Sequence, residues 1–383
     1  MSTDRSRVLV ILLAGGAGSR LGPLTATRAK PSLPFGGMFR LVDVALSNIA
    51  HSGLDDVWVL VQYEPHALNE HLSNGRPWDL DRTHGGLRVL PPFQVKDQAD
   101  DVATVAAGNA DALVQHRRLI AEHGTDVVVT MSADHVYRLD LRDVLHTHAA
   151  RGAALTIVTT DPHPDDDPTR FAWVTADDDG AVTGFDYKPD TPTGDRVCTE
   201  VFAFDATTLL RHLDALPGGE DGVDHAGDYG ESLLPAFVAG EDVVEHRLDG
   251  YWRDIGTLRA YHRAHLELID DDPPFDLDDR SWPLLTGSIT GGPARVSTGA
   301  TIERVVLSPG VRVAGTVRDS VLGRHVTVEA GATLERCVVL DDAVIRAGAT
   351  VHDAIVNIAT TVGPRSTPIT GPDADPDVAV FDG

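Results

Sequence analysis

Lysine is scarce in this chain, and positive charge of any kind is outweighed by negative charge. Only Lys30, Lys96 and Lys188 occur among 383 residues, and 58 acidic residues against 32 basic ones give a net charge of −26 at pH 7. Nucleic acids and anionic membrane surfaces would be repelled by such a protein, so we expect neither as a partner. A solubilising surface is the simplest explanation of the acidity. Two of the three lysines, Lys30 and Lys188, belong to the candidate site described below.

Cysteines and long apolar runs are also few. Cys198 and Cys337 lie far apart in apolar, strand-like segments, which favours buried free thiols and a reducing compartment. No apolar run approaches the roughly 18 residues of a membrane-spanning helix, and no charged-then-apolar leader is visible at the N-terminus. We therefore predict a soluble, cytoplasmic protein. Its apolar content of 42% supports a normal core, and its length allows two or three domains.

A glycine-rich stretch follows the first apolar run. Residues 8–13 are long enough for one buried strand and too short for a helix. They lead into Ala14-Gly15-Gly16-Ala17-Gly18, where missing Cβ atoms let backbone N–H groups approach an anion. Arg20 follows at once and Lys30 comes ten residues later, so we predict a polyphosphate site. The P-loop is excluded because Ser19-Arg20 follows Gly18, and the dinucleotide fingerprint is excluded because Leu21 replaces its third glycine.

Apolar strands alternate with helical segments through the first part of the chain. We expect strands at 8–13, 56–62, 126–131 and 154–160, and helices at 42–52, 65–72, 102–123 and 140–151. A hairpin at 171–187, a strand at 197–204 and a helix at 258–268 follow. Near-continuous apolar strands that alternate with helices predict an α/β fold with a Rossmann-like, mostly parallel sheet covered on both faces.

Asp134 comes directly after the expected strand 126–131. Ligands of open α/β sheets bind at the carboxyl ends of the strands, so Asp134 is well placed to bind a metal. Its position alone is equally compatible with a helix N-cap.

The pattern changes from about residue 291. Helical periodicity stops, and small apolar residues recur every six positions, as at Val326, Ala332, Val338 and Val344. This interval predicts a β-helix. We expect a catalytic domain at 1–269, an acidic, proline-bearing linker at 270–290, the β-helix at 291–365 and a disordered tail at 366–383.

Ordered motifs resemble those of the sugar-1-phosphate nucleotidyltransferases, and within them the glucose-1-phosphate adenylyltransferase (ADP-glucose pyrophosphorylase) family. They are L-A-G-G-x-G-x-R-L from Leu13, R-A-K-P from Arg28, F-G-G-x-F-R-L-x-D from Phe35, S-A-D-H-V-Y from Ser132 and Y-W-R-D-I-G-T from Tyr251. The resemblance implies a left-handed β-helix, a homotetramer, and a reaction between a nucleoside triphosphate and a sugar 1-phosphate.

The resemblance also implies a role for each motif residue. Arg20, Lys30 and Asp134 would be catalytic, and Asp134 and Asp254 would bind Mg²⁺. The implied nucleotide-binding residues are Ala14, Gly15, Gly16, Gly18, Gly108 and Asp111, and the residues facing the sugar phosphate are Lys188, Tyr187 and Glu200. The attacking phosphate, with a second pKa of about 6, is already mostly dianionic at neutral pH, so no general base is needed. The site must supply positioning and charge neutralisation.

Several departures from the family pattern fall in the sugar-binding half. Tyr187 replaces a glutamate, Glu200 replaces a glycine and Trp173 replaces a small apolar residue, while Ala107 and Asn109 differ near the base. The first hypothesis is synthesis of ADP-glucose from ATP and glucose 1-phosphate for glycogen. The second is transfer from ATP or GTP to a modified sugar or cyclitol 1-phosphate, such as valienol 1-phosphate. The third, a non-catalytic regulatory subunit, is opposed by the intact Arg20, Lys30 and Asp134.

Overall fold

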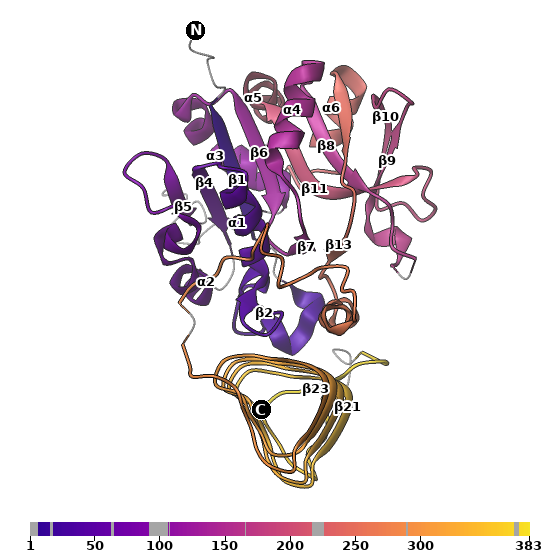
Figure 1. Ribbon diagram of the computed structural model, residues 1–383. Coiled ribbons are helices and arrows are strands. Elements are labelled where there is room, and N and C mark those ends of the chain that lie inside the picture. The colour runs from indigo at the N-terminus through magenta and orange to yellow at the C-terminus, as the bar shows by residue number, and fades with distance from the viewer. Residues whose placement is uncertain are drawn as a thin grey trace, which may run out of the picture.

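The computed structural model describes residues 7–15, 18–62, 65–91, 106, 108–164, 166–216, 226–288, 290–370 and 375–383. A large sheet with helices on both faces forms the N-terminal part, and a triangular β-helix lies against its lower side in Figure 1. Within these residues no helix is long and apolar enough to cross a membrane.

The large sheet has the order β10-β9-β11-β6-β1-β4-β5, and β8 and β12 are joined to it through β11. In the described part of the chain, β10 and β11 run against the direction shared by the other strands, so the sheet is mostly parallel as predicted. The strands are β1 (Val8–Ala14), β4 (Asp56–Val61), β5 (Gly86–Leu90), β6 (Val127–Ser132), β8 (Leu155–Thr160), β9 (Ala172–Ala176), β10 (Val182–Tyr187), β11 (Arg196–Asp205) and β12 (Val243–Arg247).

Helices cover the two faces of this sheet. They are α1 (Leu41–His51), α2 (Pro65–Leu72), α3 (Asn109–His123), α4 (Leu141–Arg151), α5 (Ala206–Ala215), α6 (Leu233–Gly240) and α7 (Leu258–Leu266). Val10 and Leu12 of β1 join a core with α1, α2 and α4, whereas Leu9 and Ile11 join a core with α3, α5 and α6. Because successive residues of a strand point to opposite faces, one continuous apolar run fills both cores.

One helix differs from its prediction in length. The expected helix 102–123 begins at Asn109, after Gly108 in an extended conformation, and most of its predicted first turns lie outside the described residues.

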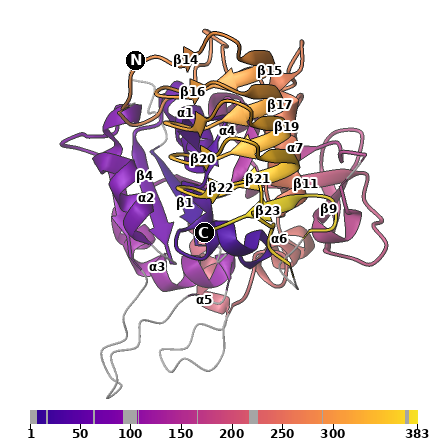
Figure 2. The ribbon, with the colours of Figure 1, turned by 90° about the horizontal axis from the view of Figure 1, so that it is seen from below.

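The C-terminal part is a β-helix of two stacked parallel sheets (Figures 1 and 2). One sheet contains β14 (Arg295–Val296), β16 (Arg312–Val313), β18 (Thr327–Val328), β20 (Val344–Ile345) and β22 (Thr361–Val362). The other contains β15 (Thr301–Leu307), β17 (Thr316–Leu322), β19 (Thr333–Val339), β21 (Thr350–Val356) and β23 (Ala379–Phe381). From the six-residue repeat, Val326 and Ala332 are buried inside the coils, whereas Val338 is buried on the outside, in an apolar cluster with the catalytic domain.

The predicted disordered tail at 366–383 is wrong for its last residues. β23 pairs in parallel with β21, from Ala354 opposite Ala379 to Val356 opposite Phe381. Val378 and Val380 are buried in a shared apolar cluster. The prolines and aspartates of this segment suggested disorder, but its short apolar run covers the otherwise exposed last coil of the β-helix.

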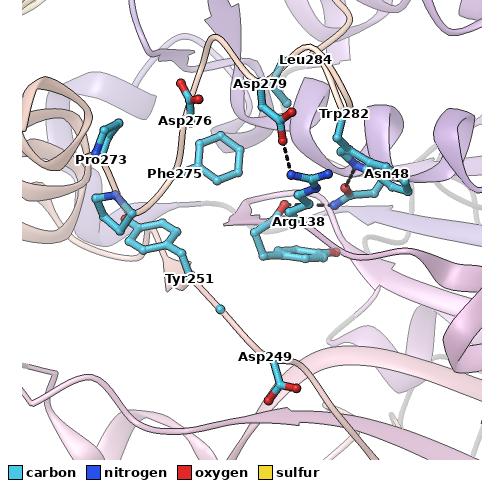
Figure 3. Close-up of a pocket in the computed structure, with 13 residues that line it drawn as sticks. Asn48, Arg138, Asp249, Tyr251, Pro273, Phe275, Asp276, Asp279, Trp282 and Leu284 are labelled. Atoms are coloured by element: carbon cyan, nitrogen blue, oxygen red, sulfur yellow. Dashed lines mark hydrogen bonds and ion pairs between the residues drawn. The ribbon is translucent and has the colours of Figure 1, made fainter. Parts of the chain in front are cut away.

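The predicted linker lies along the catalytic domain. Trp282 donates from Nε1 to Asn48 Oδ1 of α1 at 2.9 Å. Arg138 forms an ion pair with Asp279 beside it, and Figure 3 shows the pocket that the linker encloses with these residues. The segment is therefore held at several points rather than suspended between domains.

The β-helix docks onto the residues around the glycine-rich loop. Leu33 and Phe35 share an apolar cluster with Val338 and Ile355 of the β-helix, and α7 packs on β17 and β19. Arg40 pairs with the buried Asp341 at 2.9 Å. Arg28 likewise donates to Asn357 Oδ1 at 3.2 Å. Two arginines of the phosphate motifs thus anchor the second domain.

Candidate active site

The glycine-rich loop leaves the carboxyl end of the central strand β1. Ala14 is buried at the end of the strand and Gly15 follows it, while Gly16 lies outside the described residues. Gly18 has a φ of +62°, and a Cβ there would lie 2.9 Å from Thr25 Cγ2. The Thr25 hydroxyl and the Leu21 amide both donate to the Gly18 carbonyl, at 2.9 and 2.8 Å. Glycine at position 18 is thus required by both conformation and space.

Two short strands bring the predicted metal ligands together. β7 (His135–Tyr137) follows β6 and pairs with β13 (Trp252–Asp254), so that His135 lies opposite Asp254. Lys30 begins the 3₁₀ helix η2 (Lys30–Ser32) and reaches both carboxylates: its Nζ lies 2.5 Å from Asp134 Oδ2 and 3.4 Å from Asp254 Oδ1. Three residues from distant parts of the chain thus converge on one point at the carboxyl edge of the sheet.

The charges in this cluster stabilise one another. Burial favours the neutral form of Lys30, but Asp134 and Asp254 outweigh it and raise its pKa above the ordinary value. Burial would likewise raise the pKa of each carboxyl group, but Lys30 and His135 outweigh burial and hold both values below the usual range. All three side chains are therefore charged at neutral pH, in a site where Lys30 is only 7% exposed.

Two further residues of the cluster were missed by the sequence reasoning. His135 Nε2 lies 3.6 Å from Asp134 Oδ1 and 3.7 Å from Asp254 Oδ1, and Nδ1 faces the carbonyl oxygen of Thr199 at 3.1 Å, so Nδ1 carries the proton. Arg170 places a guanidinium nitrogen 3.4 Å from Asp254 Oδ2. His135 could have been found as the neighbour of Asp134 in its motif. Arg170 sits in an irregular loop without a motif, so no signal pointed to it.

The donor set fits a divalent cation. Ligand atoms of Asp134, His135 and Asp254 lie within 4.8 Å of one another. The ammonium group of Lys30 lies within reach of both Asp134 and Asp254, so the two carboxylates point towards one common position. Carboxylate oxygens are the ligands that Mg²⁺ prefers, and it takes them together with waters and substrate phosphates. Asp134 and Asp254 would therefore hold the ion.

Arg20 lies near Lys30 and Arg170. It belongs to η1 (Ser19–Thr25) and is exposed, and among the residues that the structure describes no acid pairs with it. Its positive charge acts to lower the pKa of Lys30 and of Arg170, although at Lys30 the two carboxylates outweigh it.

Lys188 and Tyr187 form a second cluster around Asp228. The Tyr187 hydroxyl donates to Asp228 Oδ2 at 2.7 Å, and Lys188 Nζ donates to the same hydroxyl at 2.5 Å. Lys188 Nζ lies 3.8 Å from Asp228, and the lysine side chain is 47% exposed. Burial and the neighbouring Asp228 raise the pKa of Tyr187, so its hydroxyl stays protonated. Asp228, which was not predicted as a site residue, thus holds Tyr187 and Lys188 together.

Asp228 also connects the sugar-phosphate residues with the start of α3. Its Oδ1 accepts from the Asn109 amide at 3.2 Å, and the Ala110 and Asp111 amides donate to the Gly227 carbonyl at 3.1 Å. A Cβ on Gly108 would lie 2.4 Å from the Gly227 backbone, so only glycine allows this approach. Asp111 is buried and accepts from Gln115, and contact of Gly108 and Asp111 with a nucleotide stays a prediction.

Glu200 lies on β11, between β6 and the β9–β10 hairpin that ends at Tyr187. Its φ is +58°, in a bulge of the strand, and its side chain is half-buried. Burial raises the pKa of Glu200, and the nearby Asp134, Asp254 and Asp228 act in the same direction, against His135. The residue therefore faces both clusters.

Comparisons with known proteins agree with this architecture. A family model described as "Nucleotidyl transferase" matches residues 9–271, and one described as "GlmU-like, C-terminal hexapeptide" matches residues 293–382. The glucose-1-phosphate adenylyltransferase of Thermotoga neapolitana is 36% identical over 330 residues, which are 86% of this chain and 76% of that protein. That of Thermomicrobium roseum is 37% identical over 360 residues, or 94% and 82%. That of Clostridium novyi is 33% identical over 325 residues, or 85% and 83%.

These matches span both domains and most of each relative. The site they cover holds cations and converging carboxylates suited to phosphate chemistry. The chain is a sugar-1-phosphate nucleotidyltransferase and belongs to the glucose-1-phosphate adenylyltransferase family.

Proposed function

We propose that this enzyme transfers the adenylyl group of ATP to glucose 1-phosphate, giving ADP-glucose and pyrophosphate for glycogen synthesis. The observation that carries the proposal is the convergence of Lys30, Asp134 and Asp254 beside a glycine loop at the carboxyl edge of the sheet. Curated relatives with the name glucose-1-phosphate adenylyltransferase, matched over most of their length, support the choice of substrates.

The residues have separate tasks in this reaction. Lys30 is fixed by two carboxylates before substrate arrives, so it can stabilise negative charge on the transferred phosphate without reorganisation. Arg20, exposed and near Lys30, is available for the leaving pyrophosphate. Lys188 can turn from the Tyr187 hydroxyl to the sugar phosphate, because it is half-exposed. When bound on Asp134 and Asp254, Mg²⁺ supplies further neutralisation of the phosphate oxygens.

A second substrate class has support of its own. Tyr187 occupies the family's glutamate position and pairs with Asp228, while Glu200 introduces a carboxylate in place of glycine. These changes favour a modified sugar or a cyclitol 1-phosphate, such as valienol 1-phosphate, with ATP or GTP as donor. Both hypotheses use the same phosphate chemistry and differ in the ring. A cytoplasmic homotetramer, implied by the resemblance, remains part of the proposal.

The test is pyrophosphate release with Mg²⁺, using ATP, GTP and UTP against glucose 1-phosphate and its analogues. We expect release with ATP and glucose 1-phosphate, abolished by Asp134→Asn. Asp342→Asn, which changes an exposed carboxylate of the β-helix, should leave the rate unchanged. Release only with another pair would select the second substrate class. If folded protein released no pyrophosphate with any pair, both substrate hypotheses would be overturned. The hypothesis of a non-catalytic regulatory subunit would then remain.

A further inference from the structure

The backbone at Glu200 is held in a conformation that side chains rarely adopt. Its φ of +58° lies in the left-handed region, where residues other than glycine, asparagine and aspartate are uncommon. Between Cys198 opposite Thr159 and Phe202 opposite Ile157, β11 advances four residues while β8 advances two, so a bulge surrounds Glu200. Strained residues persist where the surrounding structure supports them, and they cluster at binding sites.

Neighbouring contacts fix the direction of the bulge. The Thr199 hydroxyl donates to the Val158 carbonyl at 2.9 Å and is fully buried, while the Thr199 carbonyl accepts from His135. Val201 is opposite Met131, near the end of β6 that leads to Asp134. Glu200 is therefore held beside the metal-binding carboxylates on one side and the hairpin with Tyr187 and Lys188 on the other.

The carboxylate of Glu200 is half-buried without a partner. Among the described residues it accepts no hydrogen bond and forms no ion pair. The nearby Tyr187 hydroxyl is used by Asp228 and Lys188. A carboxylate withdrawn from water needs hydrogen-bond donors, and a bound substrate can bring them.

We propose, on the basis of the function proposed above, that Glu200 determines ring specificity by accepting hydrogen bonds from ring hydroxyl groups of the sugar or cyclitol 1-phosphate. The phosphate of such a substrate turns towards Lys188, so the part left to face β11 is the ring. The family has a glutamate at position 187, on β10, whereas in this chain the carboxylate is that of Glu200, on β11. The site therefore selects a ring with several hydroxyl groups over a deoxy analogue.

The test compares the effect of each Glu200 variant on the KM of the substrate with its effect on the KM of deoxy analogues. KM is measured by pyrophosphate release for glucose 1-phosphate and its 2-, 3-, 4- and 6-deoxy analogues, with wild type, Glu200→Gly and Glu200→Gln. We expect Glu200→Gly to raise the KM of glucose 1-phosphate about 10- to 100-fold, as for one or two hydrogen bonds to a charged group. For an analogue that lacks a contacted hydroxyl, wild type and variant should differ by less than about threefold. Glu200→Gln, which keeps one acceptor oxygen, should show a smaller increase.

Controls separate recognition from folding. Asp342→Gly removes a carboxylate from another left-handed residue, with φ of 60°, in the β-helix, and should change no KM. Glu200→Gly should keep or raise the melting temperature because glycine relieves the backbone, and the KM of ATP should stay constant.

Two outcomes would overturn the inference. If Glu200→Gly changed the KM of glucose 1-phosphate and of all four analogues equally, Glu200 would not recognise ring hydroxyl groups. The proposed reaction would still stand. If wild type uses another sugar 1-phosphate, the deoxy analogues of that compound give the same comparison. Absence of pyrophosphate release with every pair would overturn the proposed function and this inference with it.

Discussion

Lys30 and Lys188 both precede a proline and both lie beside aspartate, but their surroundings differ. Lys30 is 7% exposed and sits between two carboxylates. Lys188 is 47% exposed, has a φ of +46° and rests on a tyrosine hydroxyl. The first lysine is locked in place before substrate binds, whereas the second must leave its present partner to hold a phosphate.

The difference extends to the two halves of the site. Around Lys30 the two carboxylates, Asp134 and Asp254, each pair with a cation, and Lys30 comes from a segment that also holds the β-helix. Around Lys188, Tyr187 and Asp228 leave room for adjustment, and so does Glu200, which has no partner in the described part of the chain. A rigid half suits a reaction step shared by many enzymes, and an adaptable half suits the recognition of a particular ring.

The largest effect is expected from Lys30→Gln. Loss of a preorganised cation should lower kcat about 10²- to 10³-fold, or about 3–4 kcal/mol, by analogy with a lost oxyanion donor. Steady-state pyrophosphate release measures it, with Arg118→Gln, an arginine that is 88% exposed, as a control that should match wild type. A decrease of less than tenfold would show that Lys30 serves only to balance its two carboxylates.

Asp254→Asn should come next and should act through the cation. Removing one of two carboxylate ligands is expected to weaken Mn²⁺ binding at least tenfold, because the loss of a residue that only supports a ligand already weakens metal binding about 10- to 100-fold. Titration followed by electron paramagnetic resonance of free Mn²⁺ measures this without turnover. Equal Mn²⁺ affinity of variant and wild type would exclude Asp254 as a ligand.

Lys188→Gln should affect substrate binding more than turnover. Loss of one charged contact in a half-exposed position is expected to raise the KM of the sugar 1-phosphate tenfold to thirtyfold, about 1.5–2 kcal/mol, with kcat changed less. The KM of the nucleotide serves as the internal control and should not change. If Lys188→Gln lowered kcat by a larger factor than it raised KM, Lys188 would act on turnover as Lys30 does. The proposed difference between the two halves of the site would then be wrong.

Tyr187→Phe should give the smallest effect. The ring that packs against Gly230 is kept, and only the hydrogen bonds to Asp228 and Lys188 are lost. We expect a change in the KM of the sugar 1-phosphate below about fivefold, or about 1 kcal/mol. A change as large as that of Lys188→Gln, measured in the same assay, would mean that the hydroxyl itself contacts substrate.

Much of the architecture could be predicted from the sequence because its signals are local. The apolar run at 8–13, the helices at 42–52 and 65–72 and the six-residue repeat from 291 correspond to observed elements. The motifs also assigned Lys30, Asp134 and Asp254 to one site, and the structure brings the three together. Periodicity and short motifs carry such information because each depends on neighbouring residues.

The remaining features depend on contacts between distant segments. Arg170 contacts Asp254 across 84 positions, and Tyr187 contacts Asp228 across 41. The local sequence around these residues does not indicate which distant residue each one meets. His71 of α2 contacts the fully buried Asp43 of α1 at 2.5 Å, across 28 positions. The composition of the tail predicted disorder. Its strand β23 forms because β21, in the last coil of the β-helix, has a free edge with which it can pair.

The ion pair between Arg40 and Asp341 has a consequence for the descent of the family. It joins positions 301 residues apart, and Arg324 binds the same carboxylate at 2.7 Å. A substitution of Asp341 alone would leave Arg40 and Arg324 without their shared carboxylate at the boundary of the domains. Positions 40, 324 and 341 should therefore change together among related sequences, and the two domains should be inherited as a pair rather than exchanged singly.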